Sequence, residues 1–390
     1  MDFRFTPEEE AFRQEIRNFL KEEPPDKFPI QDDDEGYGYG AWSNEYVKRL
    51  GQKKWLGLTW PSKYGGGGRP PAYLYHLFNE LAYGYAPAEA LFFVEQGGGT
   101  ICRYGNEELK NEVLPKLMAG KETVVEGLSE MNAGSDLLSL KTRAVKDGDD
   151  YIINGDKIWT SNGHLARYDL VIARTDPDAP RHKGISAFLI DLDLPGVTRK
   201  PIGDMAGGNG FSEMFFDNVR VPKRYLVGRE NNGFLELLAT LEWDRFWGRC
   251  MKSSYLQRLL NDLVAYCNLT NNGPVLSKDR LVQNALAELQ ADISACRVLF
   301  YRALWIMQTG ELSIEASVAK TFADELSQKF ARIAMNILGP YGQLTEESEM
   351  APLEGKIQKL RLTSVGHTLA GGTTEIQLTT IATRGLGLPR

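Results

Sequence analysis

The chain has 390 residues, with 45 Lys and Arg against 52 Asp and Glu, so its formal net charge is −7. This acidic balance, without a block of basic residues, argues against a nucleic-acid-binding protein. No run of about 18 apolar residues is present, which excludes a membrane span. Four cysteines and four histidines fall at no metal or redox spacing, so we expect reduced thiols and no metal site. The charged N-terminus does not resemble a secretion signal, which predicts a cytoplasmic protein.

Helical patterns fill the first part of the chain. Thr6-Pro7-Glu8-Glu9 is a capping box with proline at the first helical position, and an apolar helix face begins at Phe12. The glycine run at residues 65–68 lacks the Lys-Ser/Thr that follows a phosphate loop, so it predicts a turn. We expect an N-terminal helical domain over residues 1–120.

Short β-rich runs separated by turn pairs mark the middle of the chain. Lys157-Ile158-Trp159 is one such run, and Asp147-Gly148 and Asn154-Gly155 are two of the turn pairs. This pattern predicts a compact, antiparallel middle β-domain over residues 121–228.

After Gly228 the helical period returns. We expect a helix that Asn231-Asn232-Gly233 caps and that continues through Cys267, and then helices from about Arg280 to Gln308 and from Val318 to Gly339-Pro340. A glycine-rich turn after residue 367 precedes one more helix. These patterns predict a C-terminal four-helix bundle over residues 229–390. The fold class is therefore mainly α with a central β-domain.

Four motifs occur in order over nearly the whole chain. They are Leu128-Ser129-Glu130-Met131-Asn132-Ala133-Gly134-Ser135-Asp136, Asn154-Gly155-x-Lys157-x-Trp159-Thr160-Ser161-Asn162, Asp217-Asn218-Val219-Arg220-Val221-Pro222 and Gly371-Gly372-Thr373-Thr374-Glu375-Ile376-Gln377. Together they resemble the acyl-CoA dehydrogenase family of flavoproteins. The first motif departs from the usual Thr-Glu-Pro-x-Ala-Gly-Ser-Asp of that family by Ser for Thr and Met for Pro.

The resemblance implies an FAD site. A flavin ring needs a flat apolar platform with hydrogen-bond donors beside it, and Trp159 followed by two hydroxyl residues offers both. The residues that the resemblance assigns to the cofactor are Leu128, Ser129, Ala133, Gly134, Ser135, Trp159, Thr160, Ser161, Gly372, Thr373, Thr374 and Glu375.

The reaction of the family removes a proton from Cα of an acyl thioester and a hydride from Cβ, and it needs a desolvated carboxylate as the base. Most members carry a Glu just before the Gly-Thr of the last motif, where this chain has Gly371. Some members instead place the carboxylate directly before an Arg on the first long C-terminal helix, and Asp244-Arg245 matches that arrangement. We predict Asp244 as the base; Glu242, Glu375 and the absence of any base are the alternatives.

The resemblance places the acyl pocket along the helix that contains residues 92–100. Glycines cost a helix about 1 kcal/mol each relative to alanine, so Gly97, Gly98 and Gly99 indicate space or close approach. We expect a branched, cyclic or otherwise bulky acyl group. A salt-bridged structural role for Glu95 and a solvated loop around Arg181 remain alternatives. The predicted substrate-binding residues are Glu95, Ser135, Arg181, Lys183, Arg245 and Gly371.

The absence of one family motif bears on the oligomeric state that we expect. Related homotetramers carry an Arg and a Phe-Gly that reach the flavin of a neighbouring subunit, and residues 271–280 lack the Phe-Gly here. Heteromeric members that act on steroid side chains show a similar loss. We therefore expect an acyl-CoA dehydrogenase that forms a 2-enoyl-CoA and passes electrons to an electron-transfer flavoprotein. We expect a tetramer, and favour one with a second acyl-CoA dehydrogenase-like subunit. A non-catalytic partner subunit and a flavin oxidase or desulfinase are the alternatives.

Overall fold

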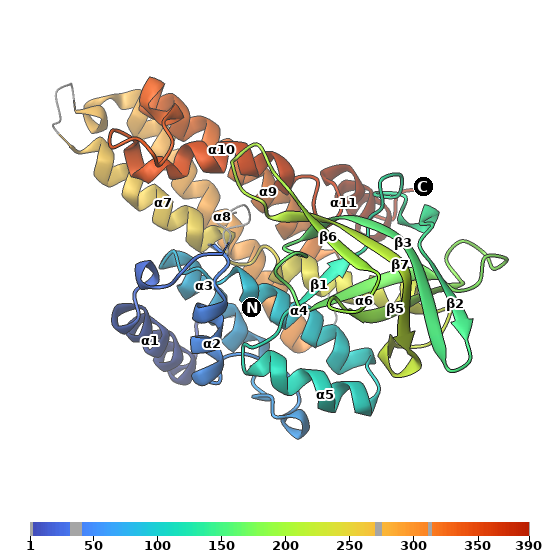
Figure 1. Ribbon diagram of the computed structural model, residues 1–390. Coiled ribbons are helices and arrows are strands. Elements are labelled where there is room, and N and C mark those ends of the chain that lie inside the picture. Colours follow the sequence, from blue (N-terminus) through green and yellow to red (C-terminus); the bar gives the residue numbers. More distant parts are fainter. Residues whose placement is uncertain (1–2, 32–40, 270–274, 311–313, 390) are drawn as a thin grey trace.

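The computed structural model describes residues 3–31, 41–269, 275–310 and 314–389, without the side chains of Ala239 and Glu242. N-terminal helices, a β-sheet and C-terminal helices follow one another along the chain and occupy separate parts of the molecule (Figure 1). Among the described residues, no helix is long and apolar enough to span a membrane.

Five α-helices form the described portion of the N-terminal part. The predicted capping box at the first of them is confirmed, because the Thr6 hydroxyl accepts from the Glu9 amide at 3.2 Å and the Glu9 carboxylate accepts from the Thr6 amide at 2.8 Å. The helices are α1 (Pro7–Glu22), α2 (Asn44–Gln52), α3 (Pro71–Tyr83), α4 (Glu89–Tyr104) and α5 (Glu107–Met118).

The middle part is an eight-stranded sheet with the order β6-β7-β3-β2-β4-β5-β8, in which β1 pairs with β4. Most pairs are antiparallel as expected, but β4 pairs in parallel with β1 and, at one end, with β2. Other strands connect the members of each parallel pair, since parallel pairing needs a crossover connection. The strands are β1 (Val124–Gly127), β2 (Arg143–Asp147), β3 (Asp150–Ser161), β4 (Tyr168–Arg174), β5 (Ile185–Asp191), β6 (Val197–Ile202), β7 (Phe211–Pro222) and β8 (Leu226–Val227).

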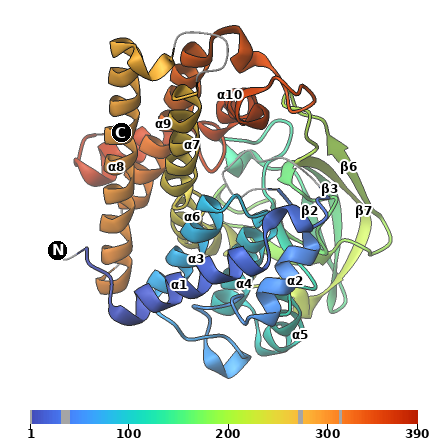
Figure 2. The same cartoon turned by 90° about the vertical axis from the view of Figure 1, so that its left-hand side faces the viewer.

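The C-terminal helices α7, α8, α9 and α10 pack side by side as a bundle (Figures 1 and 2). α6 packs against α9 of this bundle, against β5 of the sheet and against α4. The six helices are α6 (Gly233–Trp247), α7 (Lys252–Cys267), α8 (Arg280–Thr309), α9 (Glu315–Leu338), α10 (Lys356–His367) and α11 (Thr374–Thr380).

One predicted helix is wrong: the helix expected to continue through Cys267 breaks after Trp247 into α6 and α7. Gly248 ends α6, and the next residue, Arg249, turns into the bundle, where it forms a 2.7 Å ion pair with Asp324 of α9. The expected cap at Asn232 also differs, because its side-chain amide donates to Glu236 rather than accepting from the helix amides.

α4 and α6 occupy the centre of the molecule (Figure 1). α4 contacts β1, α6 contacts β5 and α9, and the two helices contact each other. Residues on their facing sides therefore lie where the three parts of the chain meet.

Candidate active site

A cavity of about 330 Å³ lies between α4 and α6. Residues at helical spacing on both helices face this cavity. They are Glu95, Gly99 and Arg103 on α4 and Thr240, Trp243, Asp244 and Trp247 on α6. A larger cavity, of about 620 Å³ among α1, α3, α7 and α8, contains none of the predicted site residues. The remaining residues that line the smaller cavity are Thr59, Trp60, Pro61, Leu74, Gln96, Thr100 and Cys102.

Of the three glycines of α4, two permit close approach of neighbouring groups and one leaves open space, which are the two roles expected for them. A Cβ on Gly97 would lie 2.3 Å from Cβ of Val124, and one on Gly98 would lie 2.1 Å from the Trp60 ring, so both glycines permit close approach. A Cβ on Gly99 would have no atom within 4 Å. Gly99 therefore opens the cavity, whereas the other two let the strand and the tryptophan pack against the helix.

Asp244 is held at the cavity wall with part of its carboxylate unsatisfied. Its Oδ2 is buried and has no hydrogen-bond partner among the described residues. Burial raises the pKa of Asp244 to about 7, against the lowering effects of a hydrogen bond from Gln96 and of the Arg245 charge. A carboxylate with such a pKa takes up and releases protons near neutrality, which suits a general base.

Other carboxyl groups lie close to Asp244. Burial raises the pKa of Glu126 well above its usual value, and the charges of Asp244 and Asp169 raise it further. Burial likewise raises the pKa of Asp169 to about 7. The region around the cavity therefore disfavours negative charge, although it is rich in acidic residues.

Glu95 is buried and lies on the same cavity wall. Its Oε1 accepts from the Gly57 amide at 2.6 Å, and its Oε2 has no partner among the described residues. Burial raises the pKa of Glu95 to about 8, despite donors from Gly57 and from the Trp60 side chain that lower it. No ion pair within the described part of the chain involves Glu95, so the salt-bridged structural alternative finds no support there.

Strand β3 carries a bulge at Trp159. One extra residue between Lys157 and Thr160 shifts the register against β7, and Trp159 has a positive φ of 61°. Non-glycine residues seldom adopt this conformation, and such strain concentrates at functional sites. The Trp159 side chain is 56% exposed, and the Thr160 hydroxyl is buried without a partner in the described structure.

The loop of the first motif is joined to β3 by three contacts. The Ile158 amide donates to the Ser129 carbonyl at 2.9 Å, and the buried Lys157 Nζ donates to the Leu128 carbonyl at 3.0 Å. Lys157 also pairs with Glu130 at 3.0 Å. The first two motifs therefore form one structural unit, in which Gly134 and Ser135 are exposed and Ala133 is buried.

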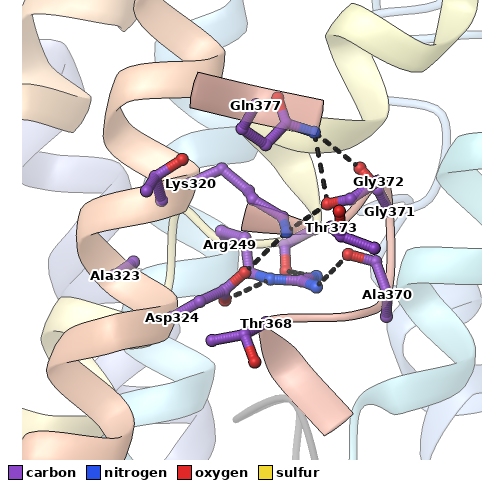
Figure 3. Close-up of polar contacts among 12 residues, drawn as sticks. Arg249, Lys320, Ala323, Asp324, Thr368, Ala370, Gly371, Gly372, Thr373 and Gln377 are labelled. Carbon is purple, nitrogen blue, oxygen red and sulfur yellow. Dashed lines mark hydrogen bonds and ion pairs between the residues drawn. The ribbon is translucent and has the colours of Figure 1, made fainter. Parts of the chain in front are cut away.

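Figure 3 shows that buried cationic side chains bind the backbone carbonyls of the loop of the last motif. Lys320 Nζ donates to the Gly372 carbonyl at 2.7 Å, and Arg249 donates to the Ala370 carbonyl at 3.5 Å. Gln377 of α11 donates to the Gly371 carbonyl at 3.0 Å. Gly371 itself has a φ of 66°, and a Cβ there would have no neighbour closer than 3.9 Å, so the loop offers space but no base at this position.

The cations behind this loop share one anion. Asp324 pairs with Arg249 at 2.7 Å, with Lys252 at 2.8 Å and with Lys320 at 3.0 Å, and its side chain is fully buried. We call these four residues the Asp324 cluster. Burial opposes the charge of Asp324, but the three cations outweigh it and hold its pKa well below the usual range.

Comparison with known proteins decides the family. Models of the N-terminal, middle and C-terminal domains of acyl-CoA dehydrogenases match residues 6–121, 126–219 and 231–386. The chain belongs to the acyl-CoA dehydrogenase family. This acyl-CoA dehydrogenase is 32% identical over 402 residues to "Acyl-CoA dehydrogenase FadE26" of Mycobacterium tuberculosis, a match that covers 100% of this chain and 99% of that protein.

Solved structures of the family superpose over the full length. The "Tcur3481-Tcur3483 steroid ACAD" matches with a TM-score of 0.89 and 33% identity, and "the ChsE4-ChsE5 complex from Mycobacterium tuberculosis" with a TM-score of 0.88 and 30% identity. Both matches cover 100% of this chain and of the other chain. The enzyme is therefore an FAD-dependent oxidoreductase with the three-part fold of its family.

The structure offers suitable groups for FAD at the bulge of β3. An exposed indole there supplies an apolar face, and the Thr160 hydroxyl beside it is buried without a partner in the described structure. Leu128 and Ser129 are held next to this strand. These residues fit a flavin ring, which needs an aromatic platform flanked by hydrogen-bonding groups.

The other predicted site residues are more scattered. Glu375 is exposed, and hydrogen bonds from its own amide and from Thr373 lower its pKa, which makes it a poor base. Arg181 is exposed and pairs with Asp136 at 2.6 Å, beside the first motif, and Lys183 is exposed. The side chain of Glu242 and residues 271–274 lie outside the described residues.

Sequence reasoning missed several buried polar residues of the site. Lys320 and Asp324 are four residues apart on the buried face of α9, and a Lys-Asp pair among alanines was the available signal. Lys157 and Glu130 lie within two of the motifs, but the sequence did not predict their ion pair. Glu126 and Asp169 carried no signal beyond an acidic residue in an apolar strand.

Proposed function

We propose that this acyl-CoA dehydrogenase converts a branched, cyclic or otherwise bulky acyl-CoA into its 2-enoyl-CoA, with Asp244 as the base. The observation that carries the proposal is the buried Asp244 carboxylate with one unsatisfied oxygen at the cavity wall. Bound FAD supplies the acceptor for the hydride that leaves Cβ.

The chain's own residues supply the proton transfer. Asp244 takes the Cα proton onto its carboxylate, and its raised pKa lets it hold that proton near neutral pH. Arg245, the next residue, lowers the pKa of Asp244 and keeps part of the population ionised. Trp243 and Trp247 line the same cavity and exclude water from the reacting carbons.

The shape of the cavity supports a bulky acyl group. Gly99 leaves open space where any other residue would place a Cβ, and the tryptophans Trp60, Trp243 and Trp247 provide broad walls. Two similar structures are the Tcur3481-Tcur3483 steroid ACAD and the ChsE4-ChsE5 complex. These names support the proposed substrate class by analogy of fold and sequence.

We further propose an electron-transfer flavoprotein as the electron acceptor and a tetramer that includes a second acyl-CoA dehydrogenase-like subunit. The missing Phe-Gly before α8 and the two-protein names of both similar structures support the second subunit. The electron acceptor is proposed from membership of the family alone. A pyrophosphate at a subunit boundary needs cationic or amide donors in place of water, so another subunit must supply them.

One experiment tests these points together. The chain is purified alone and after co-expression with a related subunit, and its mass, flavin content and visible spectrum are recorded. Straight-chain, branched and cyclic acyl-CoAs are then added without oxygen. We expect bleaching of the flavin absorption, strongest with the cyclic thioesters. Colourless protein in every preparation would indicate a non-catalytic subunit, and a stable homotetramer with one flavin per chain would contradict the heteromer.

A further inference from the structure

The cavity beside Asp244 is apolar on most of its wall and polar along one strip of α4. Indole rings and aliphatic groups cover the apolar part. Along the strip, the Thr100 hydroxyl already donates to the Gln96 carbonyl at 3.2 Å, and burial raises the pKa of Cys102 to about 12, which keeps its thiol neutral. The strip also carries Gln96 and Arg103, and Glu95 is a buried group on it whose Oε2 has no hydrogen-bond partner among the described residues.

The surroundings of Glu95 favour its neutral form. A carboxylate buried without a cation is strongly disfavoured, and no ion pair in the described chain reaches this side chain. The groups around it are the Gly57 amide, the Trp60 side chain and the neutral Cys102 thiol. A neutral carboxyl group carries one O–H donor, and Oε2 has no partner among the described residues.

We infer that Glu95, as a neutral carboxylic acid, donates a hydrogen bond to a ketone or hydroxyl oxygen at the far end of the acyl group. This inference rests on the proposed function and narrows it to acyl-CoAs whose ring carries oxygen. Asp244 and Glu95 come from facing helices and line one cavity, so a single substrate contacts both. Asp244 acts at Cα, and Glu95 selects the distal oxygen.

The cavity volume sets the size of this acyl group. A dry apolar cavity of about 150 Å³ binds one benzene ring, so a cavity of about 330 Å³ corresponds to roughly two such rings. An acyl group of that size contains one or two rings. The flat indole walls favour a rigid ring over a flexible chain of equal size, because a ring loses less conformational entropy on binding.

Two thioesters that differ only in the distal oxygen test the inference. They are 3-(4-oxocyclohexyl)propanoyl-CoA and 3-cyclohexylpropanoyl-CoA, assayed with the flavin-loaded enzyme and an artificial electron acceptor. We expect kcat/KM to favour the ketone by roughly tenfold or more, because the apolar ring leaves the Glu95 donor unpaired. Glu95→Gln keeps an N–H donor and retains much of the preference, whereas Glu95→Leu removes it. Glu45→Gln, on the exposed face of α2, serves as the control.

The outcomes separate this inference from the proposed function. If neither thioester bleaches the flavin of the wild-type enzyme, the proposed function fails. If both are oxidised with equal kcat/KM, or if Glu95→Leu keeps the preference for the ketone, the inference fails while the function stands. Flavin content and thermal midpoint are measured for each variant, and a Glu95→Leu protein that loses flavin is replaced by Glu95→Met.

Discussion

Asp244 and Asp324 both have buried carboxylate oxygens in the C-terminal half of the chain, yet their surroundings move their pKa values in opposite directions. Asp244 has an unsatisfied oxygen, and burial raises its pKa to about 7. Asp324 has three cations within 3.0 Å, and its pKa falls well below the usual range. The difference shows that burial alone does not decide protonation, because the number of paired cations determines whether a carboxylate is available for proton transfer.

The sharpest test of this comparison is to neutralise Asp244. Asp244→Asn keeps the size of the side chain but cannot accept the Cα proton, so we expect turnover to fall by ~10²-fold or more. Flavin binding should persist. Steady-state turnover and the visible spectrum measure both, with the exposed Asp147→Asn as the control. Near-normal turnover would exclude Asp244 and favour Glu242 or Glu95.

Neutralising Asp324 should instead affect stability. Asp324→Asn leaves Arg249, Lys252 and Lys320 buried without their anion, and breaking such a buried pair costs about 3–5 kcal/mol. We expect the thermal unfolding midpoint to fall by several degrees. Asp147, which pairs with Arg220 at the surface, is the matched control and should lose at most about 1 kcal/mol. Equal losses in both variants would contradict the role of the Asp324 cluster.

The two aspartates also differ in their response to pH. The base must be ionised to act, and burial raises the pKa of Asp244 to about 7, so kcat/KM should increase with pH through an inflection near 7. Asp324 has a lowered pKa and stays ionised throughout this range. A pH profile of kcat/KM measures the inflection, and a flat profile between pH 6 and 8 would contradict it.

The smallest expected effect is on stability, and it compares Gly99, which faces open space near Asp244, with the closely packed Gly98. Gly99→Ala adds a methyl group into the cavity and should stabilise α4 by up to about 1 kcal/mol, because alanine is the better helix former. Gly98→Ala places the same group 2.1 Å from the Trp60 ring and should destabilise the protein. Thermal midpoints of the two variants measure the contrast, and a loss with Gly99→Ala would show that the cavity wall is packed.

Local patterns predicted much of the fold. The capping box at Thr6, the helix from Arg280 and the turn at Asp147-Gly148 are confirmed, because each depends on contacts a few residues apart. The turn expected at Asn154-Gly155 is wrong, because both residues lie inside β3, where the register against β7 shifts. The break after Trp247 was not predicted in this way, and beside it Arg249 pairs with Asp324, which lies 75 residues later in the chain. Long-range partners of this kind leave only weak traces in a single sequence.

The candidate site followed the same rule. Asp244 and Trp159 were found because they occur in motifs that resemble a known family. The burial of Glu95 and the raised pKa of Glu126 beside Asp244 depend on segments that meet only in the folded chain. The sequence shows directly that residue 371 is a glycine and cannot act as a base. It does not show that Arg249 and Lys320 bind the carbonyls of that loop.

The loop at Gly371 has a consequence for the direction of its backbone donors. In a trans peptide the N–H lies opposite the C=O. Because Arg249 and Lys320 bind the carbonyls of Ala370 and Gly372, the amides of Gly371 and Thr373 point away from these cations. The direction of these two donors is thus set from outside the loop, by Lys320 of α9 and by Arg249 between α6 and α7. A side chain at residue 371 would be strained at its φ of 66°, so the loop keeps this backbone with glycine there while the proposed base stands on α6.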